Sequence, residues 1–131
     1  MNDFLIKFVA WTKFKIRLYL RDDRIIFYKQ REIWWASLGI NIGHEQNGKN
    51  NRFERPVLIL KKFGNKTLWV LPLTSKEKTS RFYQQLNNFN HKSWIDLSQI
   101  RLISSKRLLR KITLIADFDF KKIQQRVKDL I

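Results

Sequence analysis

Arg55 and Thr74 are the two side chains in this sequence best suited to hold a phosphate group. Arg55 precedes an apolar run at 56–63, and Thr74 follows a second apolar run at 66–73. A short Gly-Asn link between the runs is typical of a tight antiparallel hairpin. The turn lies at one end of such a hairpin, so the other end brings Arg55 close to Thr74. A guanidinium fork can donate to two phosphate oxygens and a hydroxyl can donate a third bond, so this pair predicts a phosphate site.

Further polar side chains stand near the ends of expected strands. A polar loop precedes Arg55, a polar pair follows Thr74, and two residues share a face of a later strand because they are two positions apart. These residues are His44, Glu45 and Gln46, then Ser75 and Lys76, then Gln99 and Arg101. A histidine in such a loop is suited to proton transfer near neutral pH. Alternatives remain open: His44 could only make a loop hydrogen bond, Arg55 could pair with Glu54 or Glu45, and Thr74 could cap a turn.

The composition favours a polyanionic partner. The chain has 131 residues, with 27 Lys and Arg against 11 Asp and Glu, and its formal net charge is +16. A surface of this sign attracts nucleic acid in preference to an anionic membrane or an acidic protein. Hydrophobic residues make up 44% of the chain, which is enough for one compact domain with a modest core.

Several classes of chemistry are disfavoured. The chain has no cysteine, so disulfides, thiolate nucleophiles and cysteine-ligated zinc are excluded. It has two histidines and few, scattered carboxylates, so we expect no metal and no cofactor. We find no Gly-rich phosphate loop, no Ser-centred elbow and no aromatic RNA-binding motif of the common four-stranded type.

The elements that position these residues are mostly short strands. The patterns predict strands, a turn and helices in this order: a helix at 3–20, strands at 32–38, 56–63, 66–73 and 81–86, a turn at 87–92, a strand at 93–103, a short helix SKRLLRKI capped by Ser104 or Ser105, and a last helix beginning at Asp117 or Asp119. On the last helix, Phe120, Ile123, Val127 and Leu130 form an expected core-facing stripe. Few short strands usually close to hide their edges, so we expect a small antiparallel barrel with flanking helices.

The first helix carries both apolar and basic side chains. Leu5, Val9, Ile16 and Tyr19 share one face, which predicts packing on a neighbouring element. Basic residues interrupt the segment, so it cannot cross a bilayer cheaply, although a basic amphipathic helix could rest on a membrane or a partner. No small-residue cleavage site follows it, and we expect a cytoplasmic protein without a membrane partner.

Five blocks occur in an order that resembles the MazF/PemK family of toxins from bacterial toxin–antitoxin systems. They are REIWWASLG (31–39), GHEQNG (43–48), RPVLIL (55–60), LPLTS (71–75) and LSQIRLISSKRL (97–108). The resemblance covers residues 31–131, which we expect to form the toxin domain. Residues 1–30 then form an N-terminal helical extension.

The resemblance implies a fold and an activity. The fold would be a dimer of small Src-homology-3-like barrels. The activity would be metal-independent cleavage of single-stranded RNA, usually mRNA, at short preferred sequences. A cognate antitoxin would neutralise the toxin, and the pair would bind operator DNA. A non-catalytic, basic nucleic-acid-binding barrel remains the alternative function.

The resemblance also assigns roles to residues. It places Arg55 and Thr74 at the cleavage site, matches the family's Glu to Glu45 and gives His44 a part in substrate handling. The expected RNA contacts are Gln46, Ser75, Lys76, Gln99 and Arg101. The chain departs from the family at two points: Ser98 stands where some members have an acid before the Gln, and GKNNRFE lengthens the loop before Arg55.

Overall fold

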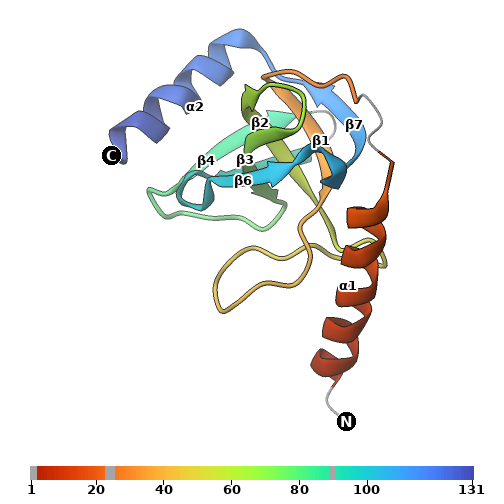
Figure 1. Cartoon of the computed structure of the whole chain (residues 1–131). Helices are drawn as coiled ribbons and strands as arrows, with labels where there is room; N and C mark the ends of the chain where they lie inside the picture. The colour runs from red at the N-terminus through yellow and green to blue at the C-terminus, as the bar shows by residue number, and fades with distance from the viewer. Residues whose placement is uncertain (1–2, 23–25, 89–90) are drawn as a thin grey trace.

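The computed structural model describes residues 3–22, 26–88 and 91–131. A long helix precedes a β-sheet and a shorter helix follows it (Figure 1). The elements are α1 (Asp3–Leu20), β1 (Glu32–Ser37), β2 (Glu54–Phe63), β3 (Thr67–Thr74), β4 (Tyr83–Asn88), β5 (His91–Asp96), the 3₁₀ turn η1 (Leu97–Gln99), β6 (Arg101–Ser104), the 3₁₀ turn η2 (Ser105–Arg107), β7 (Leu108–Leu114) and α2 (Asp117–Asp129).

The strands form one antiparallel sheet in the order β4-β5-β3-β2-β1-β7, and β6 also pairs with β3. The expected antiparallel β-fold with an N-terminal and a C-terminal helix is therefore confirmed. The sheet is not closed, because within the described residues β4 and β7 end the path without pairing with each other. The molecule is barrel-like only in the sense that the twisted sheet curls around its core.

Strand β2 is buried on both faces, which explains its continuous apolar run. Val57 and Ile59 pack into one hydrophobic cluster with residues of β1, β3 and β6. Leu58 and Leu60 point the other way, into a second cluster that includes Phe120 of α2. Strand β2 therefore separates the two halves of the core and fixes the position of the residue at its start, Arg55.

The C-terminal helix packs much as the sequence predicted. It begins at Asp117, the first of the two expected starting points. Phe120 and Ile123 are buried and Val127 is partly buried against the same cluster. Leu130, the fourth residue of the predicted stripe, is 41% exposed. The stripe thus covers the core only over the first part of the helix.

The predicted strand at 93–103 is interrupted. Strand β5 ends at Asp96, a 3₁₀ turn follows, and β6 begins at Arg101. The Asp96 carboxylate causes the break by accepting bonds from the Ser98 N–H at 3.1 Å and from the Ser98 hydroxyl at 2.7 Å. Strands β4 and β5 also extend into the turn predicted at 87–92, of which residues 89–90 lie outside the described residues.

The predicted short helix SKRLLRKI is wrong beyond its first turn. Ser104 does cap a turn, because its hydroxyl accepts from the Lys106 N–H. That turn is 3₁₀, and from Leu108 the chain runs as β7, paired with β1. Pairing β7 with β1 satisfies the backbone of a strand that would otherwise be an open edge, and this outweighs the local helix preference.

Helix α1 has the predicted bounds, but its predicted packing face is wrong. Leu5 is 52% exposed and Tyr19 is 78% exposed in this chain. The helix instead buries Trp11 and Leu18 on the opposite side. Neither helix of the described chain combines the length and the apolar character needed to cross a bilayer.

Helix α1 docks on the lengthened loop before β2. The Trp11 ring lies 5.4 Å from the Phe53 ring, and the Phe14 ring lies 6.1 Å from it. The Trp11 indole packs directly against the backbone of Gly39. Only glycine leaves room for it, because a Cβ at this position would lie 2.1 Å from the indole. The inserted GKNNRFE segment, which the sequence left unexplained, thus supplies part of the seat of the N-terminal helix.

Candidate active site

Strands β2 and β3 bring Arg55 and Thr74 together. Their register pairs Val57 with Pro72, and continuing it by two residues places Arg55 opposite Thr74. Both residues line one hollow of about 300 Å³. We call this hollow the Arg–Thr pocket; its lining is Trp35, Lys49, Asn50, Glu54, Arg55, Pro56, Leu73, Thr74, Ser75, Ser93 and Ile112. The neighbourhood expected from the hairpin is therefore present.

The Arg55 guanidinium is held by main-chain carbonyls. Its Nε donates to Asn47 O at 2.6 Å, and its Nη1 donates to Leu73 O at 3.1 Å. A guanidinium has five N–H donors, so three are left for an incoming anion. Burial lowers the pKa of Arg55, although the nearby Tyr83 opposes this shift. The site therefore presents a fixed, partly desolvated cation.

The carboxylates that could have neutralised Arg55 are engaged elsewhere. Glu54 receives both terminal nitrogens of Arg110, with a shortest distance of 2.7 Å. The Glu45 Oε1 accepts from the Ile42 N–H at 2.9 Å. No ion pair to Arg55 is found in the part of the chain that the structure describes. The alternative in which Arg55 merely pairs with Glu54 or Glu45 is thus excluded in this structure.

Thr74 is buried at the end of β3. Its Oγ1 accepts from the Lys76 N–H at 3.2 Å, so the hydroxyl does cap the following turn, as one alternative expected. That bond uses a lone pair of the hydroxyl and leaves its proton available. Thr74 can therefore cap the turn and donate to a ligand at the same time.

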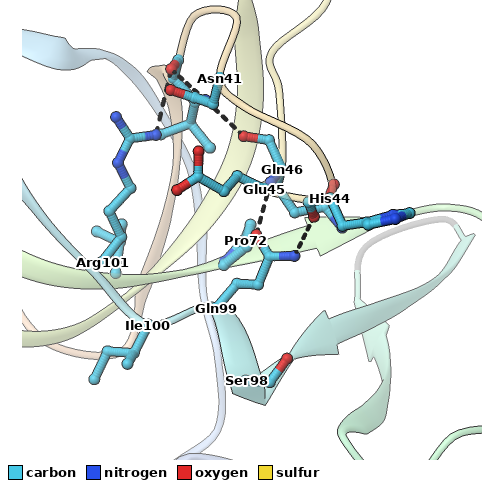
Figure 2. Close-up of a pocket in the computed structure, with 11 residues that line it drawn as sticks. Asn41, His44, Glu45, Gln46, Pro72, Ser98, Gln99, Ile100 and Arg101 are labelled. Carbon is cyan, nitrogen blue, oxygen red and sulfur yellow. Dashed lines mark hydrogen bonds between the residues drawn. The ribbon is translucent and has the colours of Figure 1, made fainter.

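A second hollow of about 530 Å³ contains most of the other predicted residues. We call it the Glu45 pocket, and Figure 2 shows its lining: Leu38, Asn41, His44, Glu45, Gln46, Val70, Pro72, Ser98, Gln99, Ile100 and Arg101. It has no lining residue in common with the Arg–Thr pocket. Apart from Lys76, the structure therefore divides the predicted site residues between two separate hollows.

Gln99 clamps the loop that carries His44, Glu45 and Gln46. Its Oε1 accepts from the Gln46 N–H at 2.6 Å, and its Nε2 donates to His44 O at 2.8 Å (Figure 2). The amide is therefore already engaged with backbone. Its role in this structure is to position the loop, and Asn41 supports the loop from inside by donating to Gln46 O at 2.8 Å.

Arg101 and Glu45 set the charge of the Glu45 pocket. Arg101 donates from Nη1 to Leu38 O at 3.3 Å. Burial lowers the pKa of Arg101, and the charge of Glu45 raises it by a smaller amount. The His44 ring is exposed and extends away from the Glu45 carboxylate (Figure 2). These side chains can contact a polar ligand from two sides of the pocket.

Sequence reasoning missed several residues of the site. Lys49 and Asn50 line the Arg–Thr pocket, although they belong to the inserted segment. Tyr83 lies near Arg55: burial and then Asp96 raise the pKa of Tyr83, and the Arg55 charge opposes them by a smaller amount, so the net shift is upward. The only available signal was the position of Lys49 in a loop next to Arg55.

Lys76, a predicted RNA contact, is exposed and lines neither pocket.

Comparisons with known proteins decide the family. Residues 29–131 match the PemK-like, MazF-like toxins of type II toxin–antitoxin systems. The chain belongs to this toxin family. The match includes no part of α1, so the helix is an addition to the part that the family shares. No curated protein sequence matches the chain.

Solved structures of toxins share the fold. MazF from Deinococcus radiodurans superposes with a TM-score of 0.64 at 16% identity, over 80% of this chain and 96% of that one. An endoribonuclease from a mycobacterial species, solved in complex with its cognate antitoxin, gives 0.62 at 11% identity, over 79% and 93%. A Mycobacterium tuberculosis MazF toxin gives 0.58 at 19% identity, over 76% and 94%.

Ser98 is a position at which this chain differs from some members of the toxin family. From the resemblance, those members have an acid here, directly before the residue that Gln99 matches. The Ser98 hydroxyl donates to the buried carboxylate of Asp96 at 2.7 Å. A carboxylate is thus present two positions earlier, but it faces the chain's own turn.

Proposed function

We propose that this chain is an endoribonuclease toxin that cleaves single-stranded RNA, usually mRNA, at short preferred sequences, without a metal ion. The observation that supports this most directly is the guanidinium of Arg55, which has no carboxylate partner among the described residues and lines one pocket with the Thr74 hydroxyl. A phosphate placed there receives charge and hydrogen bonds together. The net charge of +16 favours an RNA substrate over a neutral one.

The reaction uses the ribose 2′-hydroxyl as the nucleophile. Its oxygen bonds to the adjacent phosphorus as the bond from phosphorus to the 5′-oxygen breaks. The products are a cyclic phosphate and a free 5′-hydroxyl. Arg55 and Thr74 donate to the phosphate oxygens, whose negative charge increases in the transition state, and this preferential stabilisation lowers the barrier.

Two proton transfers complete the step: a base removes the 2′-proton and an acid protonates the 5′-oxygen. Burial lowers the pKa of Arg55, which makes Arg55 itself a better participant than an exposed arginine would be. Glu45 and His44 lie in the Glu45 pocket and are the alternative proton carriers. In that alternative His44→Ala slows cleavage partially and changes the pH–rate profile. An unchanged profile excludes His44 as acid or base.

The remaining predicted residues suit RNA binding. We assign substrate contacts to Gln46 and Arg101 in the Glu45 pocket, and to Ser75 in the Arg–Thr pocket. Lys76 lines neither pocket and would contribute only positive charge to RNA binding. Gln99 would act indirectly, by holding the loop that carries Gln46.

We propose a homodimer that binds a cognate antitoxin in the cytoplasm and, with it, operator DNA. A second copy would cover apolar side chains that β3 and β6 leave exposed, such as Trp69 at 40% and Leu102 at 58%. A relative is solved with its antitoxin, which supports a protein partner for this chain. Sedimentation of the purified chain measures the dimer directly.

The deciding experiment is end-mapping of single-stranded RNA treated with purified protein in EDTA. We expect fragments with cyclic phosphate and 5′-hydroxyl ends at a recurring short sequence. RNA that is bound but uncut by the wild type would instead support the non-catalytic nucleic-acid-binding function.

A further inference from the structure

A third hollow, of about 840 Å³, lies between α1 and the inserted segment before β2. We call it the helix groove. Lys49 and Asn50 line both this groove and the Arg–Thr pocket, so the two adjoin. The groove is built from the two features that distinguish this chain, because α1 lies entirely outside the family match and the segment lengthens the family's loop.

The helix groove is basic. Lys7 and Arg17 reach it from α1, and Lys49 and Arg52 line it from the inserted segment. No Asp or Glu belongs to its described lining. None of these four cations is in an ion pair with a described carboxylate. Holding unpaired cations close together is unfavourable, so the groove favours a polyanion.

The groove also presents aromatic and apolar surface. Phe4 and Phe14 of α1 line it. The Arg17 guanidinium lies 6.0 Å from the Phe14 ring centre. A positively charged channel with aromatic faces is the usual chemistry of single-stranded nucleic acid binding, since cations follow the backbone and bases stack on rings. An acidic peptide would need the charges but not the rings, and a second copy of this chain has few acidic side chains to offer the groove, with 11 Asp and Glu against 27 Lys and Arg.

We propose that the helix groove binds the flank of the single-stranded RNA whose scissile phosphate lies in the Arg–Thr pocket. The RNA continues past Lys49 and Asn50, its phosphates pair with Lys7 and Arg17, and an unpaired base contacts Phe4 or Phe14. This inference rests on the proposed function. It makes α1 a substrate-binding element that lengthens the footprint on RNA.

The test compares two charge reversals on the same helix. Lys7→Glu with Arg17→Glu changes the groove, and Lys13→Glu with Lys15→Glu makes the same change at exposed residues that do not line it. All variants carry Arg55→Ala, which prevents cleavage during binding. The probes are two RNAs with one cleavage sequence, flanked by about ten or about three unpaired nucleotides on each side, which span the usual site sizes.

We expect the groove reversal to weaken binding of the longer RNA about tenfold or more and to change binding of the shorter RNA by less than about twofold. Losing two phosphate contacts should reduce the salt dependence of binding by about 1.4 in the slope of log K against log salt. The control reversal should alter both RNAs equally and only slightly. Circular dichroism confirms that each variant retains its helices.

Three outcomes would overturn the inference. One is an equal loss in the groove and control pairs, which would mean a general charge effect. Another is an equal loss for the longer and the shorter RNA. The third is a groove-dependent affinity for poly-glutamate without one for RNA, which would indicate a protein partner. If the wild type cuts no RNA, the proposed function fails, yet these binding measurements still decide the role of the groove.

Discussion

Arg55 donates from Nη1 to the main-chain carbonyl of Leu73 at 3.1 Å, one residue before Thr74. This bond joins the beginning of β2 to the end of β3. It orients the guanidinium beside the Thr74 hydroxyl without consuming its charge, because the acceptor is a neutral carbonyl. The Asn47 carbonyl holds the same side chain from the loop side. The geometry is therefore fixed before any phosphate binds, which reduces the cost of reorganisation during a reaction.

Replacing Arg55 tests this arrangement. Arg55→Ala removes the phosphate donors, and we expect kcat for RNA cleavage to fall about 100- to 1000-fold. Arg55→Lys should recover little of this loss, since an ammonium keeps the charge but cannot hold two carbonyls and a phosphate in one plane. Lys122→Ala on the exposed face of α2 is the control and should cut at the wild-type rate. Wild-type cleavage by Arg55→Ala would place the active site elsewhere.

Thr74→Val removes one hydroxyl while nearly preserving side-chain volume. We expect a loss of about 10- to 100-fold in kcat, the usual range for one hydrogen bond to a charged group. Thr74→Ser should keep most of the activity because the donor remains. Thr67→Val, at the other end of β3, is the matched control. Equal activity of the valine and serine variants would show that Thr74 only caps its turn.

Gln99→Leu should free the loop that carries Gln46 without removing any group from the Arg–Thr pocket. Two hydrogen bonds are lost, so we expect the free energy of unfolding to fall by about 1–2 kcal/mol. The Gln46 amide should exchange its hydrogen faster, and KM for RNA should rise more than kcat falls. A large fall in kcat with unchanged Gln46 exchange would instead mean that Gln99 acts on the reacting atoms.

Glu32 makes stability depend on pH. Burial raises its pKa, but hydrogen bonds from Lys111, Trp34 and the Lys29 N–H, together with the Lys111 charge, leave the pKa below the ordinary value of 4.5. A depressed folded-state pKa means that the stabilisation is fully present above about pH 4.5 and is lost as the pH falls through the folded-state value.

Glu32→Gln should therefore destabilise the protein by about 1–3 kcal/mol at pH 7, because the charge partner of Lys111 is lost while part of the hydrogen bonding remains. Denaturant unfolding should show the difference between wild type and variant shrinking below pH 4.5, the ordinary value for this group. A difference that stays constant down to pH 2 would exclude this carboxylate as the source.

The sequence predicted those features that depend on local pattern. The hairpin and its strand ends were enough to place Arg55 near Thr74, because antiparallel pairing leaves no freedom in which ends meet. The two flanking helices followed from periodicity. The local pattern could not predict that Glu45 and Arg55 lie in different pockets. The position of the Glu45 loop depends on the hydrogen bond from the Gln46 N–H to Gln99, which is 53 residues away in the sequence.

The errors have a shared physical cause, which is that distant contacts overrode local preference. SKRLLRKI has helical character, yet pairing with β1 makes it a strand from Leu108 onward. The strong apolar stripe on α1 suggested a packing face, yet the face that contains Trp11 is the buried one because Phe53 and Gly39 form a matching seat. No periodicity within α1 could show which of its two apolar faces has a partner in the loop.

Gly39→Ala should undock α1 while leaving the sheet folded. The position has a φ of +79°, and the added Cβ would lie 2.1 Å from the Trp11 indole, so backbone strain and a clash act together. We expect faster hydrogen exchange in α1 and a red-shifted Trp11 emission, with little change in the amides of β2 and β3. If the helix groove binds RNA, affinity for long RNA should fall and affinity for short RNA should persist.

Gly64→Ala, at a turn with open space around it and a φ of +65°, is the control for backbone strain alone. Protection of α1 that is as high in Gly39→Ala as in wild type would show that Trp11 does not depend on this seat.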